Sequence, residues 1–552
     1  MSTKIIPIGK KIQSILLGSN AIAEPKKKTD TTATSQRSPL YSTHIYKPLL
    51  HIIEKGLHSE SQDFISGHPL EHLILKPLGV HFVPSELKQV VDSLDFKLGL
   101  YDTGTIPAST NPKSSYSEFA WTRDMANKVL AMIEMDCIDE AKKVIYALAR
   151  FNNEKEQRNV FYGLHLHESG KPNPHDKYQL DTNSHPHIRA AIDANGLMVR
   201  SQQPWGHNQL DAIGAWLYVT FYLANKLSNK KDPNYDPKFL KELDTWLTNT
   251  VNKYNGIDSI FSLTFKALNR IECWNNFDVG PWEDIYGYKR ASSIGICLKA
   301  AQEAKKYFDN NNWNAINIHD VNSFKLELTH LTENCSKALE ERIPNDGSEV
   351  KEIDRFPSDA ALTLLLEPFN PGLSEVQEQA ILKTLYEHRM GVVGFTRRDE
   401  DDYVGMDYPY NIKSKGIFSD LSNPHHKAAE WTLFDPLLAT FYYKKFNKKY
   451  NESKIIDNDI LLLAELHLKR TITQITKEED SYIKRHEDSN RIKEEKISVP
   501  HLVLPEAYWF DSTQNKWRPN ENSPLLWSEA NFILMMKEAL KAAYIMEKAQ
   551  SQ

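Results

Sequence analysis

Apolar residues recur every three or four positions in long segments of this chain, and that spacing places them on one face of an α-helix. The pattern begins at Met125 to Met135 and Ile138 to Phe151. It continues in residues 210–227, 239–254, 292–308, 359–366, 375–387, 430–446, 459–471 and 528–549. Strand-like alternation is scarce, so the sequence predicts an all-α fold. Because these helices share no repeated motif, one closed helical toroid is favoured over a solenoid.

The chain divides into three predicted parts. Residues 1–40 are rich in Lys, Thr and Ser and predict a disordered segment. Residues 41–94 carry a short apolar pattern and predict a small helical extension, whereas residues 95–552 predict one large helical domain. Within that domain, residues 152–203 and 391–427 predict long loops, where binding sites usually lie.

The composition excludes several classes of protein. A formal net charge of -6 indicates no basic surface for nucleic acid or for an anionic membrane. No apolar run is long enough to span a bilayer, and residues 12–23 are too polar for the core of a signal peptide. The sequence therefore predicts a cytoplasmic protein without a nucleic-acid or membrane partner.

Two pairs of histidines are the nearest approach to a metal-binding motif. His165 with His167, and His185 with His187, have no acidic or cysteine residue at a matching ligand spacing. Exposed or internally hydrogen-bonded histidines are the better interpretation. The sequence also has no phosphate-binding glycine loop and no G-x-S-x-G motif, so neither a metal nor an organic cofactor is predicted.

Two acids lie in loops rich in proline and aromatic residues, each ahead of a predicted helix. Glu283 directly follows Trp282 in a loop bent by Gly and Pro, and Glu506 directly follows Pro505. Cleavage of a glycosidic bond needs such a pair, with one carboxyl group protonated near neutral pH and the other ionised. Because an apolar neighbour disfavours the charged form, Trp282 favours the acid role for Glu283.

A cluster of aromatic and charged residues precedes the first long helix. Trp121, Arg123 and Asp124 can clamp a polyol, because they supply a ring face, hydrogen-bond donors and an acceptor. An aspartate helix cap beside an arginine ion pair explains the same residues. That structural alternative is the stronger one for this stretch alone.

Two later clusters are equally open to structural explanations. Trp205 and Asp211 flank several polar residues at the start of a helix, where a hydroxyl-rich ligand and ordinary capping by Asn208 are equally good interpretations. Arg397 and Arg398 begin a loop crowded with opposite charges, and a solvated loop explains that pattern better than a site does.

Taken in order, these stretches resemble glycoside hydrolase family 15, which contains glucoamylases, other α-glucosidases and the homologous domains of the phosphorylase kinase α and β subunits. The family's W-x-R-D segment is similar to Trp121–Asp124, its W-G-H-x-Q-L-D segment to Trp205–Asp211, and its general-acid segment to Trp282–Glu283. Its general base precedes an L-x-W-S helix, as Glu506 precedes Leu525–Ser528 here. The resemblance covers residues 95–548.

The chain departs from the glucoamylase pattern in two places. Asp284 stands where glucoamylases have a second glutamate. The arginine that contacts glucose in glucoamylases corresponds either to Arg397 or to Arg398, and the sequence does not choose between them.

The resemblance implies an (α/α)6 barrel, preceded by the partly disordered N-terminal extension and with an active site in the funnel at one end. It further implies an inverting, exo-acting α-glucosidase that releases glucose from the non-reducing ends of starch, glycogen or maltooligosaccharides. Glu283 would be the general acid and Glu506 the general base. The residues implied to bind substrate are Trp121, Arg123, Asp124, Trp205, Asp211, Trp282, Asp284, Arg397 and Arg398.

A second function is compatible with the same resemblance. Several stretches, such as Gly104–Ser109, are more typical of the phosphorylase kinase branch, in which glucosidase activity is not assured. The alternative is therefore a catalytically silent glucan-binding or regulatory protein. Both hypotheses predict an α-glucan or maltooligosaccharide partner, and the sequence leaves the oligomeric state open.

Overall fold

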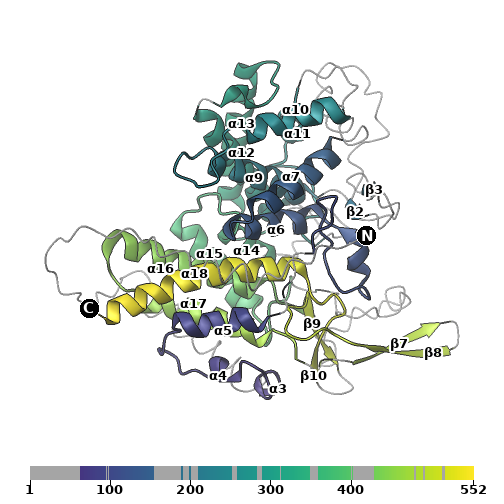
Figure 1. The fold of residues 1–552 in the computed structure, drawn as a ribbon, viewed down its shortest axis with the longest axis vertical. Helices are drawn as coiled ribbons and strands as arrows, with labels where there is room; N and C mark the ends of the chain where they lie inside the picture. Colours follow the sequence, from purple (N-terminus) through teal and green to yellow (C-terminus); the bar gives the residue numbers. More distant parts are fainter. Residues whose placement is uncertain are drawn as a thin grey trace. The chain divides into compact units, whose positions relative to one another are not determined.

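Helices dominate the structure, a computed structural model, and the strands are short (Figure 1). The all-α class predicted from the sequence is confirmed. The residues that the structure describes are 62–94, 96, 99–153, 188–190, 198–200, 209–251, 258–282, 289–310, 312–348, 358–398, 401, 428–477, 480, 482–488, 491–511 and 516–551. The predicted disordered segment, residues 1–40, lies outside them.

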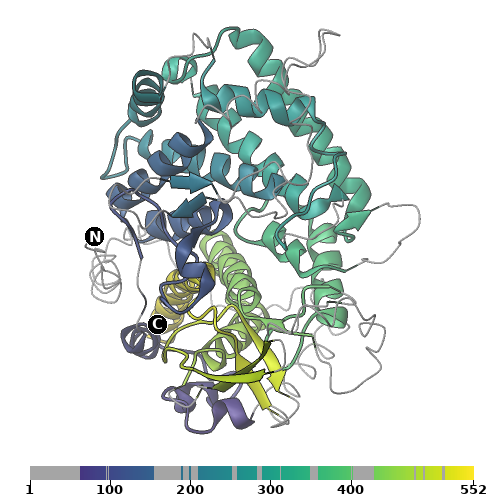
Figure 2. The same ribbon diagram turned by 90° about the vertical axis from the view of Figure 1, so that its right-hand side faces the viewer.

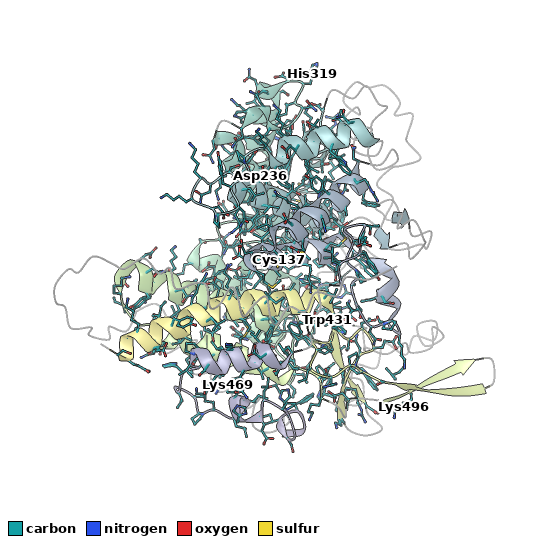
Figure 3. All side chains as sticks on the ribbon, viewed as in Figure 1. Cys137, Asp236, His319, Trp431, Lys469 and Lys496 are labelled. Atoms are coloured by element: carbon teal, nitrogen blue, oxygen red, sulfur yellow. The ribbon has the colours of Figure 1, made fainter. Side chains whose placement is uncertain are left out.

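The described residues form two compact units. Unit 1 contains Gly99–Ala108 and Glu118–Ile381, and unit 2 contains residues 62–96, Ser109–Ser117 and the chain from Leu382 onward. In each unit, buried apolar side chains pack between the helices. Figure 3 draws the described side chains on the ribbon.

In unit 1, helices pack both against helices that are adjacent in the sequence and against helices farther along the chain. α9 packs against both α6 and α12, and α12 packs in turn against α13. The helices of unit 1 are α6 (Thr122–Glu134), α7 (Ile138–Asn152), α9 (Leu210–Leu227), α10 (Phe239–Val251), α11 (Ile260–Arg270), α12 (Ala291–Asp309), α13 (Val321–Arg342) and α14 (Thr363–Leu366), with the first half of α15 (Glu375–His388).

The centre of unit 1 is α9, which is apolar on nearly every side. Its residues Trp216, Leu217 and Phe221 are completely buried, as expected of a helix without a polar face. Phe221 makes edge-on or tilted ring contacts with Phe261 of α11 and Phe308 of α12. This aromatic packing holds α9, whose first turn carries Asp211, against α11 and α12.

Unit 1 also contains two small antiparallel sheets. One is formed by β1 (Phe119–Ala120), β2 (Ile188–Ala190) and β3 (Met198–Arg200), in that order. The other pairs β4 (Lys289–Arg290) with β5 (Gly347–Ser348), so that Arg290 lies opposite Gly347.

In unit 2, α16 (Phe434–Ser453) packs against both α17 (Asn458–Thr473) and α18 (Leu526–Gln550) (Figures 1 and 2). The N-terminal helices α3 (Gln62–Ile65), α4 (Glu71–Ile74) and α5 (Pro84–Ser93) belong to the same unit. α5 lies along α18, and α4 contacts α17. The described part of the predicted N-terminal extension thus packs on C-terminal helices, while the domain boundary at residue 94 stays a prediction.

Unit 2 also carries the sheet that positions Glu506. Its strand order is β10 (Lys516–Pro519), β9 (Ala507–Asp511) and β6 (Glu430–Trp431), all antiparallel. A separate hairpin, β7 (Tyr482–Asp488) with β8 (Arg491–Ile497), projects from this region of the unit (Figure 1).

Most predicted helical segments coincide with observed helices, but three details differ. The periodicity missed α11 and α13, and the segment 430–446 begins as strand β6 before it becomes α16. The segment 359–366 contains a 3-10 turn followed by the short α14. Every helix in the part of the chain described above is too short or too polar to cross a membrane.

Candidate active site

Trp121, Arg123 and Asp124 lie together at the start of α6 and are all buried. Trp121 occupies the N-cap position, and its side chain makes no capping hydrogen bond. The interpretation of Asp124 as the helix cap is therefore wrong, because Asp124 lies inside the first turn. A carboxylate there is favoured by the positive end of the helix dipole.

Arg123 joins three segments of unit 1. Its Nε donates to Asp211 Oδ2 at 2.5 Å, and a terminal nitrogen donates to Gln209 Oε1 at 2.9 Å. The same nitrogen donates to the carbonyl oxygen of Gly280 at 3.2 Å. Arg123 and Asp211, which were predicted separately as site residues, are thus brought together, and the contacts of Arg123 connect α6 and α9 to the loop that leads to Glu283.

Asp278 anchors that loop at its beginning. One oxygen accepts a hydrogen bond from the Leu210 amide at 2.9 Å, and the other accepts from the Ser293 hydroxyl. Burial raises the pKa of Asp278 to about 7, with a further contribution from the nearby charge of Asp211.

Trp282 is anchored at the other end of the loop. Its indole Nε1 donates to Asp359 Oδ1 at 2.7 Å, and the ring is buried. Arg290 bridges Asp359 and Asp346, with N···O distances of 3.3 and 3.2 Å. Burial, followed by repulsion from Asp346, raises the pKa of Asp359 to about 7.

Gly280 allows the loop to pass close to this arginine. Its φ of +64° lies in the left-handed region that favours glycine. A Cβ at this position would meet the Arg290 side chain. The backbone of the loop therefore packs directly against the guanidinium that holds Asp359.

Three of the predicted site residues lie outside the described residues: Glu283, Asp284 and Trp205. Of these three, only Glu283 directly follows a described residue, Trp282. The geometry of unit 1 therefore defines where the chain enters the predicted acid loop.

Glu506 lies in unit 2 immediately before β9 and is only 3% exposed. Its Oε2 accepts hydrogen bonds from Asn520 Nδ2 at 2.6 Å and from Asn522 Nδ2 at 2.8 Å. Its Oε1 accepts from the Tyr116 hydroxyl at 3.1 Å. All three of these donors are neutral, and hydrogen bonds to the charged form of a carboxylate stabilise it.

The β9–β10 hairpin explains why these residues meet. Antiparallel pairing of Tyr508 with Pro519 brings Asn520 beside Glu506. The Asn520 amide then donates to the Ala507 carbonyl at 2.9 Å. On the other side, the Thr432 amide donates to the Glu506 carbonyl at 3.2 Å.

The two candidate arginines also lie in unit 2. Arg397 is buried and donates to both oxygens of Asp401, at 3.0 and 2.6 Å. Its guanidinium carbon lies 5.3 Å from the ring centroid of Trp431, which is labelled in Figure 3. Arg398 is half-buried. The choice between the two as a substrate contact therefore stays open.

Sequence reasoning missed the partners of both predicted carboxylate loops: Tyr116, Asp278, Arg290, Asp346, Asp359, Asn520 and Asn522. For the asparagines a signal was present, because residues 512–515 are polar and separate two aromatic-rich runs, which is typical of a hairpin. No comparable local signal links Tyr116 to Glu506.

Within the ranges that the structure describes, no group of three or more His, Cys, Asp or Glu side chains has the arrangement of a metal site. The described cysteines are free thiols.

The chain matches the family model described as "Glycosyl hydrolases family 15" over residues 94–470. This match, on a mostly helical chain, defines the class of the protein as a glycoside hydrolase. More particularly, the chain belongs to glycosyl hydrolases family 15, so the predicted membership and its (α/α)6 fold class are confirmed. The matched residues end before Glu506.

Solved structures with similar folds include several glycosidases. A wild-type glycosidase is 14% identical, with a TM-score of 0.49 and coverage of 90% of this chain and 99% of its own. Glucoamylase from Saccharomycopsis fibuligera is 13% identical, with a TM-score of 0.45 and coverages of 89% and 95%. A bacterial glucoamylase complexed with acarbose is 12% identical, with a TM-score of 0.42 and coverages of 84% and 57%. No curated protein sequence matches the chain.

Proposed function

We propose that the protein is an inverting, exo-acting α-glucosidase of the glucoamylase type. Its substrates are α-1,4-glucans such as starch, glycogen or maltooligosaccharides, and each reaction releases one glucose from a non-reducing end. The observation that carries this proposal is the buried Glu506 carboxylate, which receives hydrogen bonds from three neutral donors. Such an environment suits a group that must be ionised to act as a base.

Glu506 is the general base in this proposal. It takes a proton from a water molecule, whose oxygen forms a bond to the anomeric carbon of the terminal glucose. Because the water attacks from the face opposite the leaving group, the product has the β configuration. This inverting reaction needs two carboxyl groups far enough apart to admit the water.

Glu283 is the general acid. As the bond from the anomeric carbon to the glycosidic oxygen breaks, Glu283 gives its proton to that oxygen. The hydrogen bond from Trp282 to Asp359 supports this role, because it fixes the residue that precedes the acid. An apolar ring next to a carboxyl group also favours its protonated form.

The remaining predicted residues are proposed to bind the terminal glucose: Trp121, Arg123, Asp124, Trp205, Asp211, Trp282, Asp284 and either Arg397 or Arg398. The hydrogen bonds of Arg123 to Asp211 and Gly280 support a shared role for Arg123 and Asp211 in one subsite. Aromatic rings and charge-assisted hydrogen bonds are the usual means of holding a sugar ring.

The test is to incubate the purified protein with maltose, maltotriose, isomaltose and glycogen and to measure released glucose. Proton NMR of the first product should show β-glucose, and Glu283→Gln should abolish most of the release while the protein stays folded. Release of α-glucose would contradict inversion. Binding of maltooligosaccharide without any glucose release would instead support the regulatory alternative.

A further inference from the structure

We propose that Asn520 and Asn522 are positioning residues that hold the Glu506 carboxylate, through its Oε2 oxygen, in the orientation in which it accepts a proton from water. The inference rests on the proposed function, in which Glu506 is the general base. It concerns two residues that were not among the predicted site residues.

The first observation is that both asparagines donate to the same oxygen of Glu506. Asn520 and Asn522 both donate to Oε2, at 2.6 and 2.8 Å, whereas Tyr116 donates to Oε1 at 3.1 Å. A carboxylate oxygen has two lone-pair directions in its plane. Two short amide hydrogen bonds therefore use both directions on Oε2 and fix the plane of the carboxylate.

The second observation is that the rest of the structure fixes how each amide is turned. The Ser114 hydroxyl donates to Asn522 Oδ1 at 2.8 Å, so the Asn522 NH2 group faces Glu506. The Ala507 amide donates to Asn520 Oδ1 at 3.4 Å. Neither side chain can exchange its oxygen and nitrogen without losing a hydrogen bond.

The third observation is the backbone frame. The Glu506 amide donates to the Asn522 carbonyl at 3.2 Å, and the Ser523 hydroxyl donates to the Asn520 carbonyl at 2.7 Å. Both asparagines and Glu506 are at least nine-tenths buried. Their relative positions are therefore set by strand pairing and not by surface side chains.

The chemistry favours amides at this position over cations. A buried carboxylate beside Lys or Arg would be ionised but weakly basic, because the positive charge opposes uptake of a proton. Neutral amides orient the group and favour its ionised form at a smaller cost in basicity. In the reaction, one water proton moves to the Glu506 carboxylate while the water oxygen bonds to the anomeric carbon.

Three other titratable groups belong to the segments around Glu506. Tyr116 is in direct contact with Oε1. On the sheet around Glu506, Glu430 accepts hydrogen bonds from the Val393 amide at 2.6 Å. Arg518 lies 3.8 Å from Asp511.

The test compares Asn520→Leu and Asn522→Leu with a matched control, Asn447→Leu. Asn447 is also buried and donates to a carboxylate, that of Glu538 at 2.9 Å, but this pair joins α16 to α18. We expect kcat on maltose to fall roughly 10- to 100-fold in the first two variants, by analogy with other residues that orient a catalytic ligand. KM should change little.

The decisive readout is the pH dependence of kcat/KM. Its acidic limb reports the base of the free enzyme, so loss of a donor to the ionised carboxylate should move that limb to higher pH. The control should move neither kcat nor the limb. If a leucine variant does not fold, as judged by circular dichroism, the nearly isosteric Asn522→Asp replaces it, and its added charge should move the limb in the same direction.

The experiments distinguish failure of the positioning role from failure of the proposed function. If folded variants at both positions keep the wild-type kcat and acidic limb, the positioning role is wrong while the proposed function stands. If the wild-type protein releases no glucose from any α-glucan, the proposed function is wrong and this inference with it.

Discussion

The indole nitrogen of Trp282 donates a hydrogen bond to Asp359 Oδ1 at 2.7 Å. Asp359 is held in turn by Arg290, at 3.3 Å, which also contacts Asp346. Since Trp282 directly precedes Glu283, this buried chain of contacts sets the direction in which the backbone enters the proposed acid loop. Its removal should therefore impair protonation of the leaving group more than substrate binding.

Asp359→Ala should lower kcat on maltose by roughly 10²-fold, the order expected for loss of general acid catalysis. The physical reason is that Trp282 Nε1 loses its acceptor and the loop loses its anchor. The loss should be much smaller on α-glucosyl fluoride, because fluoride leaves with little need for a proton. Initial rates on the two substrates measure the effect.

Asp359→Asn is the matched control for this variant. It retains an oxygen that can accept from Trp282, so its rate on maltose should lie between those of the wild type and Asp359→Ala. Equal losses on maltose and on the fluoride would show that Asp359 does not act through the acid loop.

Asp278 should make stability depend on pH. Its pKa is raised from 3.8 to about 7 by burial, so between these values the folded protein binds more protons there than the unfolded chain. The free energy of unfolding contributed by Asp278 is therefore highest at low pH, falls as pH rises from about 4 to about 7, and is constant above that range.

Urea unfolding of the wild type and of Asp278→Asn, from pH 4 to pH 8, checks this sign. The variant keeps an oxygen for the Leu210 amide but carries no charge. We expect it to gain stability relative to the wild type as the pH rises to about 7. A difference between the two proteins that does not change with pH would contradict the prediction.

Gly280→Ala should destabilise unit 1 strongly. Gly280 has φ of +64°, and its added methyl group would displace the Arg290 side chain from two buried carboxylates. Breaking such an ion pair costs roughly 3–5 kcal/mol. Gly372→Ala is the control, because Gly372 also has a positive φ, +88°, but has nothing within 4 Å of the new Cβ.

Thermal or urea unfolding of the two variants distinguishes the cost of the left-handed backbone from the cost of the contact with Arg290. The control should lose only about 1–2 kcal/mol, the cost of left-handed backbone for a residue with a Cβ. Similar losses in both variants would mean that contact with Arg290 is unimportant.

The sequence predicted the helices better than it predicted the contacts of the candidate site residues, because helical periodicity is local in the chain and these contacts are not. The periodicity of α9 is local, so residues 210–227 were enough to predict it. α13 has fewer apolar positions and buries only one side, and its pattern was missed. The contact of Tyr116 with Glu506 joins residues 390 positions apart, and no local pattern encodes it.

The asparagines near Glu506 are an intermediate case. Asn520 and Asn522 lie 14 and 16 residues from Glu506, within one hairpin. Recognition of strands 507–511 and 516–519 would have brought them close to the acid. Because helical periodicity dominates the chain as a whole, this short sheet was not predicted.

Replacement of Glu506 by alanine should give a variant whose lost activity a small anion can restore. Glu506→Ala should lose roughly 10²- to 10⁴-fold of its hydrolytic rate, the usual contribution of a general base. The side chains of Tyr116, Asn520 and Asn522 would still point hydrogen-bond donors at the vacated position. Azide is an anion that these donors can hold, and it attacks carbon without needing a base.

With α-glucosyl fluoride as substrate, azide should bond to the anomeric carbon as fluoride leaves, giving β-glucosyl azide, which proton NMR identifies. Glu506→Gln is the control, because its side chain fills the same space and should be rescued far less. Formation of the α-azide, or equal rescue of both variants, would place the general base elsewhere. Rescue confined to the alanine variant would support water attack from the side of Glu506.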